Sequence, residues 1–133
     1  MTGVKIKNLE HKKDQRGSFV EIIRREDLEG SSMEFGQVAL TTANKGETKG
    51  KHFHKRKTEW FCIIDGIAKF RFVDKETGKE EGLTVDGKNL KLVKVLPNIW
   101  HSIENVGNEN LSVIIYIDEP FYPEDSDTYS EDL

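Results

Sequence analysis

The 133-residue chain has a single cysteine, Cys62, so no intrachain disulfide can form. This excludes a fold held together by disulfides, and a thiol inside an apolar stretch is ordinarily a small buried hydrophobe. One cysteine and no disulfide framework are typical of the reducing cytoplasm, where we expect the protein to work.

Long apolar runs and an excess of positive charge are also missing. No stretch is long enough to span a membrane, and the N-terminus has no signal-peptide profile. The formal net charge is −4 and 33% of the residues are charged, so we expect neither nucleic acid nor a membrane as a partner. This length predicts one domain with a core of its own.

Extended helical periodicity is absent, and short apolar segments alternate with turn signals. Asp65-Gly66 and Asp86-Gly87 predict tight hairpin turns. Segment 26–33 is expected to be a loop, and strands are expected at 4–9, 18–23, 37–42, 60–64, 67–73, 83–85, 90–96, around 103 and at 111–117. Strands this short and this evenly spaced favour an antiparallel barrel or sandwich, and composition does not choose between the two.

The chain becomes acidic and loses its periodicity beyond Pro120. We assign residues 1–120 to the barrel and treat residues 121–133 as part of the same domain, either a tail or a strap. The aromatic residues Phe121, Tyr122 and Tyr129 favour a strap.

The chemistry of the sequence is concentrated in one histidine-rich stretch. His52 and His54 are two residues apart and would face the same side of a strand. Glu59 follows a short polar turn, and a hairpin would bring its carboxylate back toward the two imidazoles. Two imidazoles and a carboxylate on one face suit a first-row divalent metal. An H-x-H pair also occurs for packing reasons, so the prediction depends on the wider pattern.

That wider pattern runs from Gly46 through the two histidines and Glu59 to Gly66, and it resembles the first motif of the cupin superfamily. The second cupin motif is similar to residues 96–105, which contain His101. Asn98 replaces the glycine of that motif, a mild change because asparagine tolerates a left-handed backbone.

The cupin resemblance implies an all-β fold, a double-stranded β-helix or jelly-roll barrel with a metal or a sugar in its mouth. It also implies that His101 joins His52, His54 and Glu59 as a metal ligand. Neutral imidazoles suit Zn, Fe, Ni or Mn, and we expect a divalent metal, with zinc first.

A second string, D-x-R-G-x-F-x-E from Asp14 to Glu21, resembles one in dTDP-4-dehydrorhamnose 3,5-epimerases. In those enzymes the arginine helps to hold the nucleotide diphosphate, often across a dimer interface. The resemblance implies that Arg16 binds diphosphate with its planar fork, and that the protein is a homodimer. An ordinary surface turn is the alternative. Lys49 stands where those epimerases have a second phosphate-facing arginine.

A third likeness covers nearly the whole chain, to the C-terminal cupin domain of bifunctional capsular polysaccharide assembling reductases. It is carried by K-G-x-H-x-H, by H-S-I-E-N-V-G at 101–107 and by F-x-P-x-x-x-D-T-Y at 121–129. It implies a metal-containing isomerase that epimerises a UDP- or dTDP-linked 4-keto sugar for surface polysaccharide biosynthesis. The reductase domain of those proteins is absent, so a separate reductase is an expected partner.

Roles for the remaining residues follow from this chemistry. If four ligands hold a metal, none of them is free as a base, and Lys57 becomes the first candidate, with Tyr116 as an acid. Without a metal, His52 would be the base, as in the rhamnose-pathway enzymes. Arg71, which alternates with two phenylalanines, is expected to face the mouth and bind diphosphate, and Trp100 beside His101 is either packing or a stacking surface for a nucleotide base.

Three other functions remain open for a cupin of this kind. A sugar-nucleotide 3,4-ketoisomerase begins with the same proton abstraction. A metal-dependent dioxygenase of a small substrate would use the same four ligands, although the string around Arg16 argues against a substrate without a diphosphate. A non-catalytic sugar-binding cupin is the third.

Overall fold

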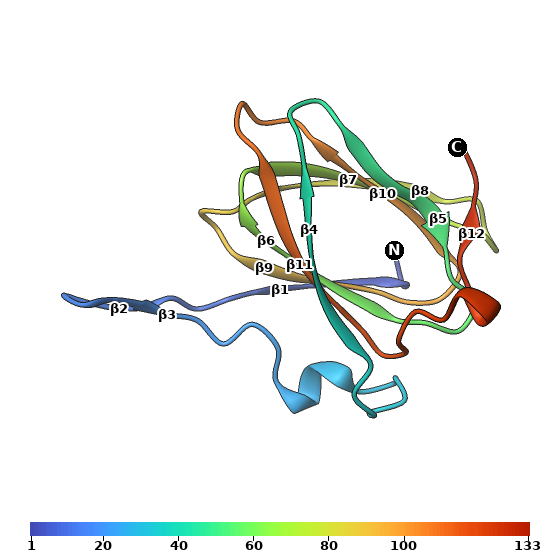
Figure 1. Ribbon diagram of the computed structural model, residues 1–133, viewed down its shortest axis with the longest axis horizontal. Helices are drawn as coiled ribbons and strands as arrows, with labels where there is room; N and C mark the ends of the chain where they lie inside the picture. Colours follow the sequence, from blue (N-terminus) through green and yellow to red (C-terminus); the bar gives the residue numbers. More distant parts are fainter.

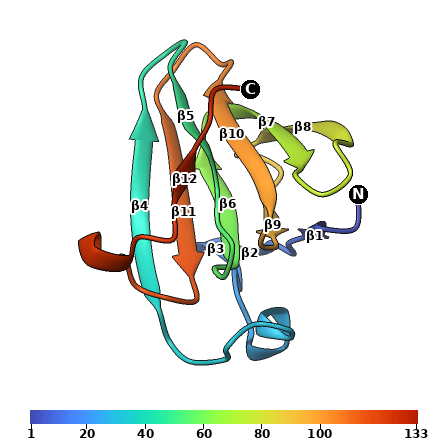
Figure 2. The ribbon, with the colours of Figure 1, turned by 90° about the vertical axis from the view of Figure 1, so that its right-hand side faces the viewer.

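The computed structural model describes residues 1–133 and consists of two five-stranded sheets that face each other across one core (Figures 1 and 2). Every strand pair is antiparallel. The first sheet has the order β1-β9-β6-β11-β4, and the second has the order β12-β5-β10-β7-β8. The strands are β1 Val4–Asn8, β4 Gln37–Ala43, β5 Thr48–Phe53, β6 Glu59–Asp65, β7 Ile67–Asp74, β8 Glu80–Asp86, β9 Lys91–Val95, β10 Ile99–Asn105, β11 Leu111–Ile117 and β12 Tyr129–Ser130. The predicted all-β jelly-roll barrel is confirmed.

Alternate side chains from both sheets meet in one core between them. The aromatic rings of Phe61, Phe70 and Phe72 lie at its centre, with ring centroids 5.8 Å apart for the first pair and 5.4 Å for the second. Its other members are aliphatic: Ala43, Ile63, Ala68, Val85, Val93, Val95, Ile99, Ile103, Leu111 and Val113. Burying these apolar surfaces stabilises the packing of the two sheets by about 25 cal/mol for each Å² removed from water.

The two Asp-Gly dipeptides reverse the chain but do not close hairpins. β6 and β7 flank Gly66 and belong to different sheets, and so do β8 and β9 on either side of Gly87. The two turns are joined where the Gly87 amide donates to the Gly66 carbonyl at 2.8 Å. The hairpin prediction is wrong here. An Asp-Gly dipeptide determines that the chain reverses its direction, but it does not determine which strand pairs with the segment that follows.

The segment before β4 also departs from the prediction. Only Gly17–Phe19 (β3) forms strand within the expected 18–23, and it pairs with Lys12–Asp14 (β2) in a hairpin that projects from the barrel (Figure 1). A 3₁₀ helix, η1 Arg25–Leu28, lies in the expected loop. Ile22, Ile23 and Leu28 pack instead on the outer face of the first sheet, against a small cluster around Trp60.

The C-terminal segment crosses the edge of the second sheet. After the 3₁₀ helix η2 Pro123–Asp125, β12 lies beside β5 (Figure 2) and pairs with it, with Ser130 opposite His52 in the register. The aromatic ring of Tyr129 stacks on Phe53, with centroids 5.3 Å apart. We call residues 119–133 the C-terminal strap.

No helix in the structure has the length and the apolar character that a membrane crossing requires.

Candidate metal centre

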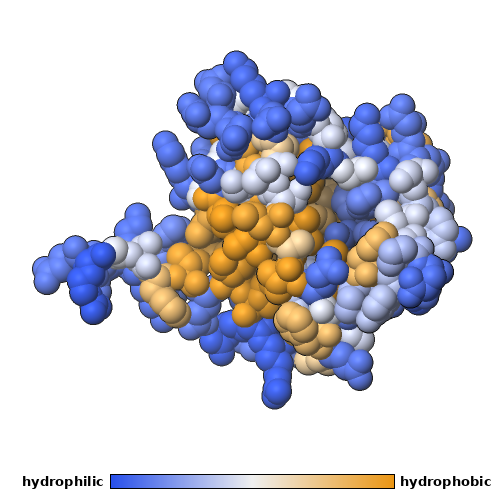
Figure 3. Space-filling model, in the orientation of Figure 1, coloured by the Kyte–Doolittle hydropathy of each residue, from blue (hydrophilic) through white to orange (hydrophobic).

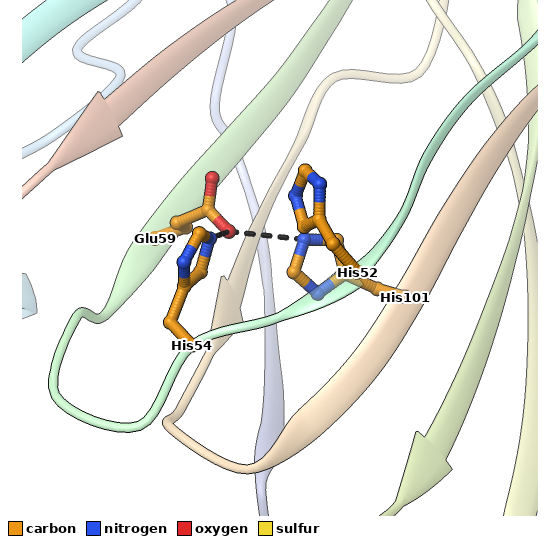
Figure 4. A group of neighbouring side chains, drawn as sticks. All are labelled: His52, His54, Glu59 and His101. Carbon is orange, nitrogen blue, oxygen red and sulfur yellow. Dashed lines mark hydrogen bonds and ion pairs between the residues drawn. The ribbon is translucent and has the colours of Figure 1, made fainter. Parts of the chain in front are cut away.

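Four side chains from three neighbouring segments converge inside one end of the barrel (Figure 4). His52 lies in β5 and His54 just after it, Glu59 begins β6, and His101 lies in β10. Their ligand atoms all lie within 4.8 Å of one another. The structure thus brings together all four residues that the sequence predicts as ligands.

The connection that carries Glu59 toward the histidines is not a hairpin. β5 belongs to the second sheet and β6 to the first, so residues 54–58 cross from one sheet to the other. Because the two sheets face each other, a strand that begins on the opposite sheet presents its first carboxylate directly to the imidazoles. The carboxylate returns as predicted, by a different route.

A bulge in β5 sets the direction of His52. The register with β10 shifts between His101 and Ser102, and Gly50 and Lys51 both have positive φ, at 91° and 60°. A Cβ on Gly50 would lie 2.9 Å from the His101 carbonyl oxygen. The extra residue puts Lys49 opposite a core residue and His52 opposite His101, so both face inward, which simple alternation would not allow.

The β9–β10 turn supports the same end of the barrel. Asn98 has φ 66°, the left-handed conformation that the sequence predicts for it. Its backbone amide donates to the His54 carbonyl at 2.7 Å. This turn therefore fixes the backbone of one ligand residue while it places another, His101, three residues later.

Backbone carbonyls determine which nitrogen of two imidazoles carries the proton. Nδ1 of His54 lies 2.7 Å from the Asp127 carbonyl oxygen, and Nδ1 of His101 lies 3.0 Å from that of Ile99. A carbonyl only accepts, so each Nδ1 must donate, and a neutral ring then has its lone pair on Nε2. Both Nε2 atoms face the same carboxylate oxygen, Oε1 of Glu59, at 2.8 Å and 3.0 Å.

Two imidazole lone pairs and a carboxylate oxygen at these distances repel one another unless a cation lies among them. A proton on Nε2 of His54 would satisfy one of the two contacts. Nε2 of His101 is buried, and despite its 3.0 Å approach to Glu59 it has no hydrogen bond of acceptable geometry. Three imidazoles and one carboxylate, two of the imidazoles held from behind by carbonyls, are a donor set that fits a divalent metal.

The electrostatics of the cluster agree with a shared positive charge. Burial opposes ionisation of His54, but its hydrogen bond to Glu59 and the charge of that carboxylate outweigh burial and raise the pKa of His54. Burial likewise opposes ionisation of Glu59, yet His101 and His54 hold the pKa of Glu59 well below its usual range. For His52, burial and then the neighbouring His101 lower the pKa to about 4.

Lys57 lies in the crossing turn, and its side chain contacts the C-terminal strap. The residue is 3% exposed, and Nζ donates to the Ser126 carbonyl at 3.0 Å. Its ammonium also lies 5.6 Å from the ring centre of Phe121.

The structure does not bring Tyr116 to the cluster. On β11 it lies opposite Trp60, on the outer face of the first sheet, whereas Glu59 faces the interior. Its hydroxyl donates to the Glu34 carbonyl at 3.1 Å and accepts from the Gly36 amide at 3.2 Å. This corrects its assignment as an acid at the cluster, because the side chain points to the other side of the sheet.

Arg71 and Trp100 also face away from the barrel interior, contrary to the expectation that Arg71 faces the mouth. Arg71 alternates with two core phenylalanines, so it projects from the outer face of the second sheet. Its guanidinium lies 5.1 Å from the ring centre of Trp100 and donates to the C-terminal carbonyl of Leu133 at 2.8 Å. Trp100 is fully buried, and its indole donates to the Glu131 carbonyl at 2.7 Å. Both residues hold the C-terminal strap.

Arg16 and Lys49 lie in different surroundings. Arg16 is at the tip of the projecting hairpin, far from β5 in Figure 1, with 86% of its side chain exposed and an ion pair to Asp14 at 2.7 Å. Lys49 donates to Thr41 Oγ1 at 2.9 Å across the gap between β5 and β4. Of these two predicted diphosphate ligands, only Lys49 shares the interior face with His52 within one chain.

Asp127 contacts His54 from a position 73 residues later in the chain, and the sequence does not predict this contact. The D-T-Y string at 127–129 belongs to a family pattern, but nothing in its local sequence points to the histidines.

The fold is that of a cupin barrel, and the four-residue cluster lies inside one end of it. A family model, the polysaccharide biosynthesis C-terminal domain, matches residues 12–129, and the chain belongs to this family. Over 117 residues it is 36% identical to UDP-2-acetamido-2,6-beta-L-arabino-hexul-4-ose reductase of Pseudomonas aeruginosa, a match that covers 88% of this chain and 30% of that protein.

Solved structures give the same result. The capsular polysaccharide assembling protein CapF of Staphylococcus aureus is 31% identical, with a TM-score of 0.72 over 94% of this chain and 34% of that one. RmlC, a dTDP-6-deoxy-D-glucose-3,5-epimerase of Legionella pneumophila, is 18% identical with a TM-score of 0.84 over 98% of this chain and 73% of that one, a likeness of fold. The chain thus spans about a third of the length of the Pseudomonas and Staphylococcus relatives.

Proposed function

We propose that this chain is a metal-containing isomerase that epimerises a carbon next to the ketone of a nucleotide-linked 4-keto sugar, in surface polysaccharide biosynthesis. One observation carries the proposal: the four-residue cluster within 4.8 Å, in a chain 36% identical to a protein named for a UDP-linked hexul-4-ose. A hexul-4-ose is a 4-keto sugar, and the carbons beside its ketone bear the protons that epimerisation must remove.

His52, His54, Glu59 and His101 would hold the metal, which supplies Lewis acidity to the charge that develops on a ketone oxygen when a neighbouring proton leaves. The protein's part is to have these four donors in position before the sugar binds. The carbonyls behind His54 and His101 do so by fixing both tautomers.

Lys57 remains our candidate for the base that removes the proton and returns it to the other face of the carbon. This role is supported by the place of Lys57 in the crossing turn between two proposed ligands. The hydrogen bond to the Ser126 carbonyl fixes the position of its amine. Lys57→Met should then abolish exchange of the sugar proton while leaving the metal content unchanged. If the chain uses no metal, His52 is the alternative base, since its ring makes no hydrogen bond and it is the least buried of the four.

We further propose that the protein acts as a homodimer in which Arg16 of one copy reaches the diphosphate bound to the other. Support comes from the hairpin, which projects away from its own barrel, and from an apolar surface over β4 (Figures 1 and 3). Phe35, Val38 and Leu40 on this surface are 76%, 58% and 65% exposed. The molar mass in solution, by light scattering, should be that of two chains, and Leu40→Glu should reduce it to one.

We place the protein in the cytoplasm, with a separate reductase acting on its product. The single cysteine, Cys62, is a buried free thiol, and burial raises its pKa to about 11, so it stays protonated and unreactive.

The decisive experiment is proton exchange in heavy water. The zinc-loaded protein is incubated with UDP- and dTDP-linked 4-keto-6-deoxy sugars, and NMR follows deuterium entering the carbons beside the ketone. We expect exchange with at least one of these sugars and none with His54→Ala. Absence of exchange with every such sugar would contradict the proposal, and full exchange by metal-free protein would contradict its metal.

A further inference from the structure

We infer that Asp127 is a positioning residue of the metal centre, which fixes both the His54 ring and the turn between two ligands from the C-terminal strap. The inference rests on the proposed metal function, which it deepens. Asp127 is 4% exposed. It makes four hydrogen bonds to residues 54–57, in and just before the crossing turn.

The carboxylate of Asp127 binds three consecutive backbone amides. Oδ1 accepts from Lys55 at 3.0 Å, and Oδ2 accepts from Arg56 at 2.9 Å and from Lys57 at 3.1 Å. The next amide, that of Thr58, donates to Oδ1 of the buried Asp118 at 3.1 Å. Two buried carboxylates therefore hold all four amides between His54 and Glu59.

This arrangement matters because the crossing turn has no strand partner of its own. Without the two carboxylates its four amides would lose these partners, and the amides of Lys57 and Thr58 are buried, where an unpaired amide is costly. The distance between His54 and Glu59 is set by this turn, so whatever fixes the turn fixes two of the four donors relative to each other.

The backbone of Asp127 acts on the metal ligand itself. Its carbonyl accepts from Nδ1 of His54 at 2.7 Å, on the far side of the ring from Glu59. A φ of 46° allows the carbonyl and the carboxylate of this one residue to reach the same turn, and aspartate is among the few residues that adopt such a backbone readily. A residue that only held the strap in place would not need a bond to the ligand ring.

The test compares three single variants for binding of Co²⁺, whose absorption spectrum reports the ligands and their geometry. Asp127→Asn keeps the shape and the tolerance for positive φ but removes the charge that three amides share. Asp118→Asn loosens the same turn without a bond to His54. Asp125→Asn is the matched control, since this strap residue pairs with Arg56 at the surface and its side chain is 65% exposed.

We expect Asp127→Asn to bind Co²⁺ about 10- to 100-fold more weakly than the wild type and with an altered spectrum, the range seen when outer partners of metal ligands are lost. Asp118→Asn should weaken binding less, with the wild-type spectrum, and Asp125→Asn should match the wild type. If the wild type binds Co²⁺ and Asp127→Asn binds it with the same affinity and spectrum, the inference is overturned. A wild type that binds neither Co²⁺ nor Zn²⁺ contradicts the proposed metal function instead.

A measurement on the wild type keeps the test decisive if Asp127→Asn does not fold. In the zinc-loaded protein, ¹⁵N NMR of the histidine rings should find His54 metal-bound at Nε2, with a slowly exchanging proton on Nδ1. A His54 that binds zinc through Nδ1, or whose Nδ1 proton exchanges freely, would refute the role of Asp127.

Discussion

Acidification of the metal-free protein should destabilise it through His52 in particular. The ordinary pKa of 6.5 falls to about 4 in the fold, because burial and the neighbouring His101 oppose a second positive charge. A group with a lowered pKa in the fold contributes stability that is present above pH 6.5 and is lost as the pH falls through 4. The neighbouring His54 works in the opposite direction, since its raised pKa gives stability that is present below pH 6.5 and is lost as the pH rises through its folded value.

The size of the His52 effect follows from this shift. At about 1.4 kcal/mol for each pKa unit, a fall from 6.5 to about 4 corresponds to at most about 3 kcal/mol. His52 is only half-buried, so solvent screening reduces the expected value to about 2 kcal/mol. This is a large part of the stability of a small domain.

Urea unfolding of chelator-treated protein at pH 7.5 and pH 4 measures this loss. Carboxylates also titrate in this range, so the informative quantity is the difference between the wild type and His52→Gln. We expect the wild type to lose about 2 kcal/mol more than the variant between the two pH values. An equal loss in both proteins would refute the claim that the cluster holds His52 neutral.

The remaining predictions concern the metal, the bulge and the hairpin. His54→Ala should reduce the bound metal from about one ion per chain to almost none, measured by elemental analysis. Metal affinity should fall as the pH is lowered, because the raised pKa of His54 means that a proton competes for its Nε2; an affinity independent of pH between 5 and 8 would count against this. Gly50→Ala should cost about 1–3 kcal/mol of unfolding free energy, since φ is 91° and the new methyl group would lie 2.9 Å from the His101 carbonyl oxygen; an unchanged urea midpoint would show that the bulge relaxes. Arg16→Ala should weaken binding of UDP- or dTDP-sugars without changing the melting temperature, because the side chain is 86% exposed. If calorimetry finds that the affinity is unchanged, Arg16 does not belong to the substrate site.

The sequence predicted the fold class and the members of the cluster for related reasons. Short, regularly spaced strands must bury their apolar side chains between two sheets, which favours a barrel or a sandwich. The spacing of His52, His54, Glu59 and His101 is that of a family pattern, and the structure brings these four side chains together. Asn98 also takes the left-handed backbone expected of it.

Tyr116 and Arg71 face away from the barrel interior, and Trp100 serves as packing, the first of its two expected roles, for one physical reason. Side chains alternate along a strand, and which set faces inward depends on the neighbouring strand and on what covers the outer face. Segments distant in sequence cover both outer faces here, η1 over Trp60 and the C-terminal strap over Trp100. An aromatic residue on such a strand is buried on either side, so hydrophobicity alone cannot indicate its direction.

The amino-acid sequence by itself determined which residues are available as metal ligands, three histidines and one glutamate, and that their spacing matches a family pattern for one end of a barrel. Only the tertiary structure decided how they are held. A bulge at Lys51 turns the His52 side chain inward, and the chain crosses between the two sheets before Glu59. Asp127, from the C-terminal strap, binds His54 and the turn that follows it. These contacts join residues up to 73 positions apart, and they exist only once both sheets have closed around a common core.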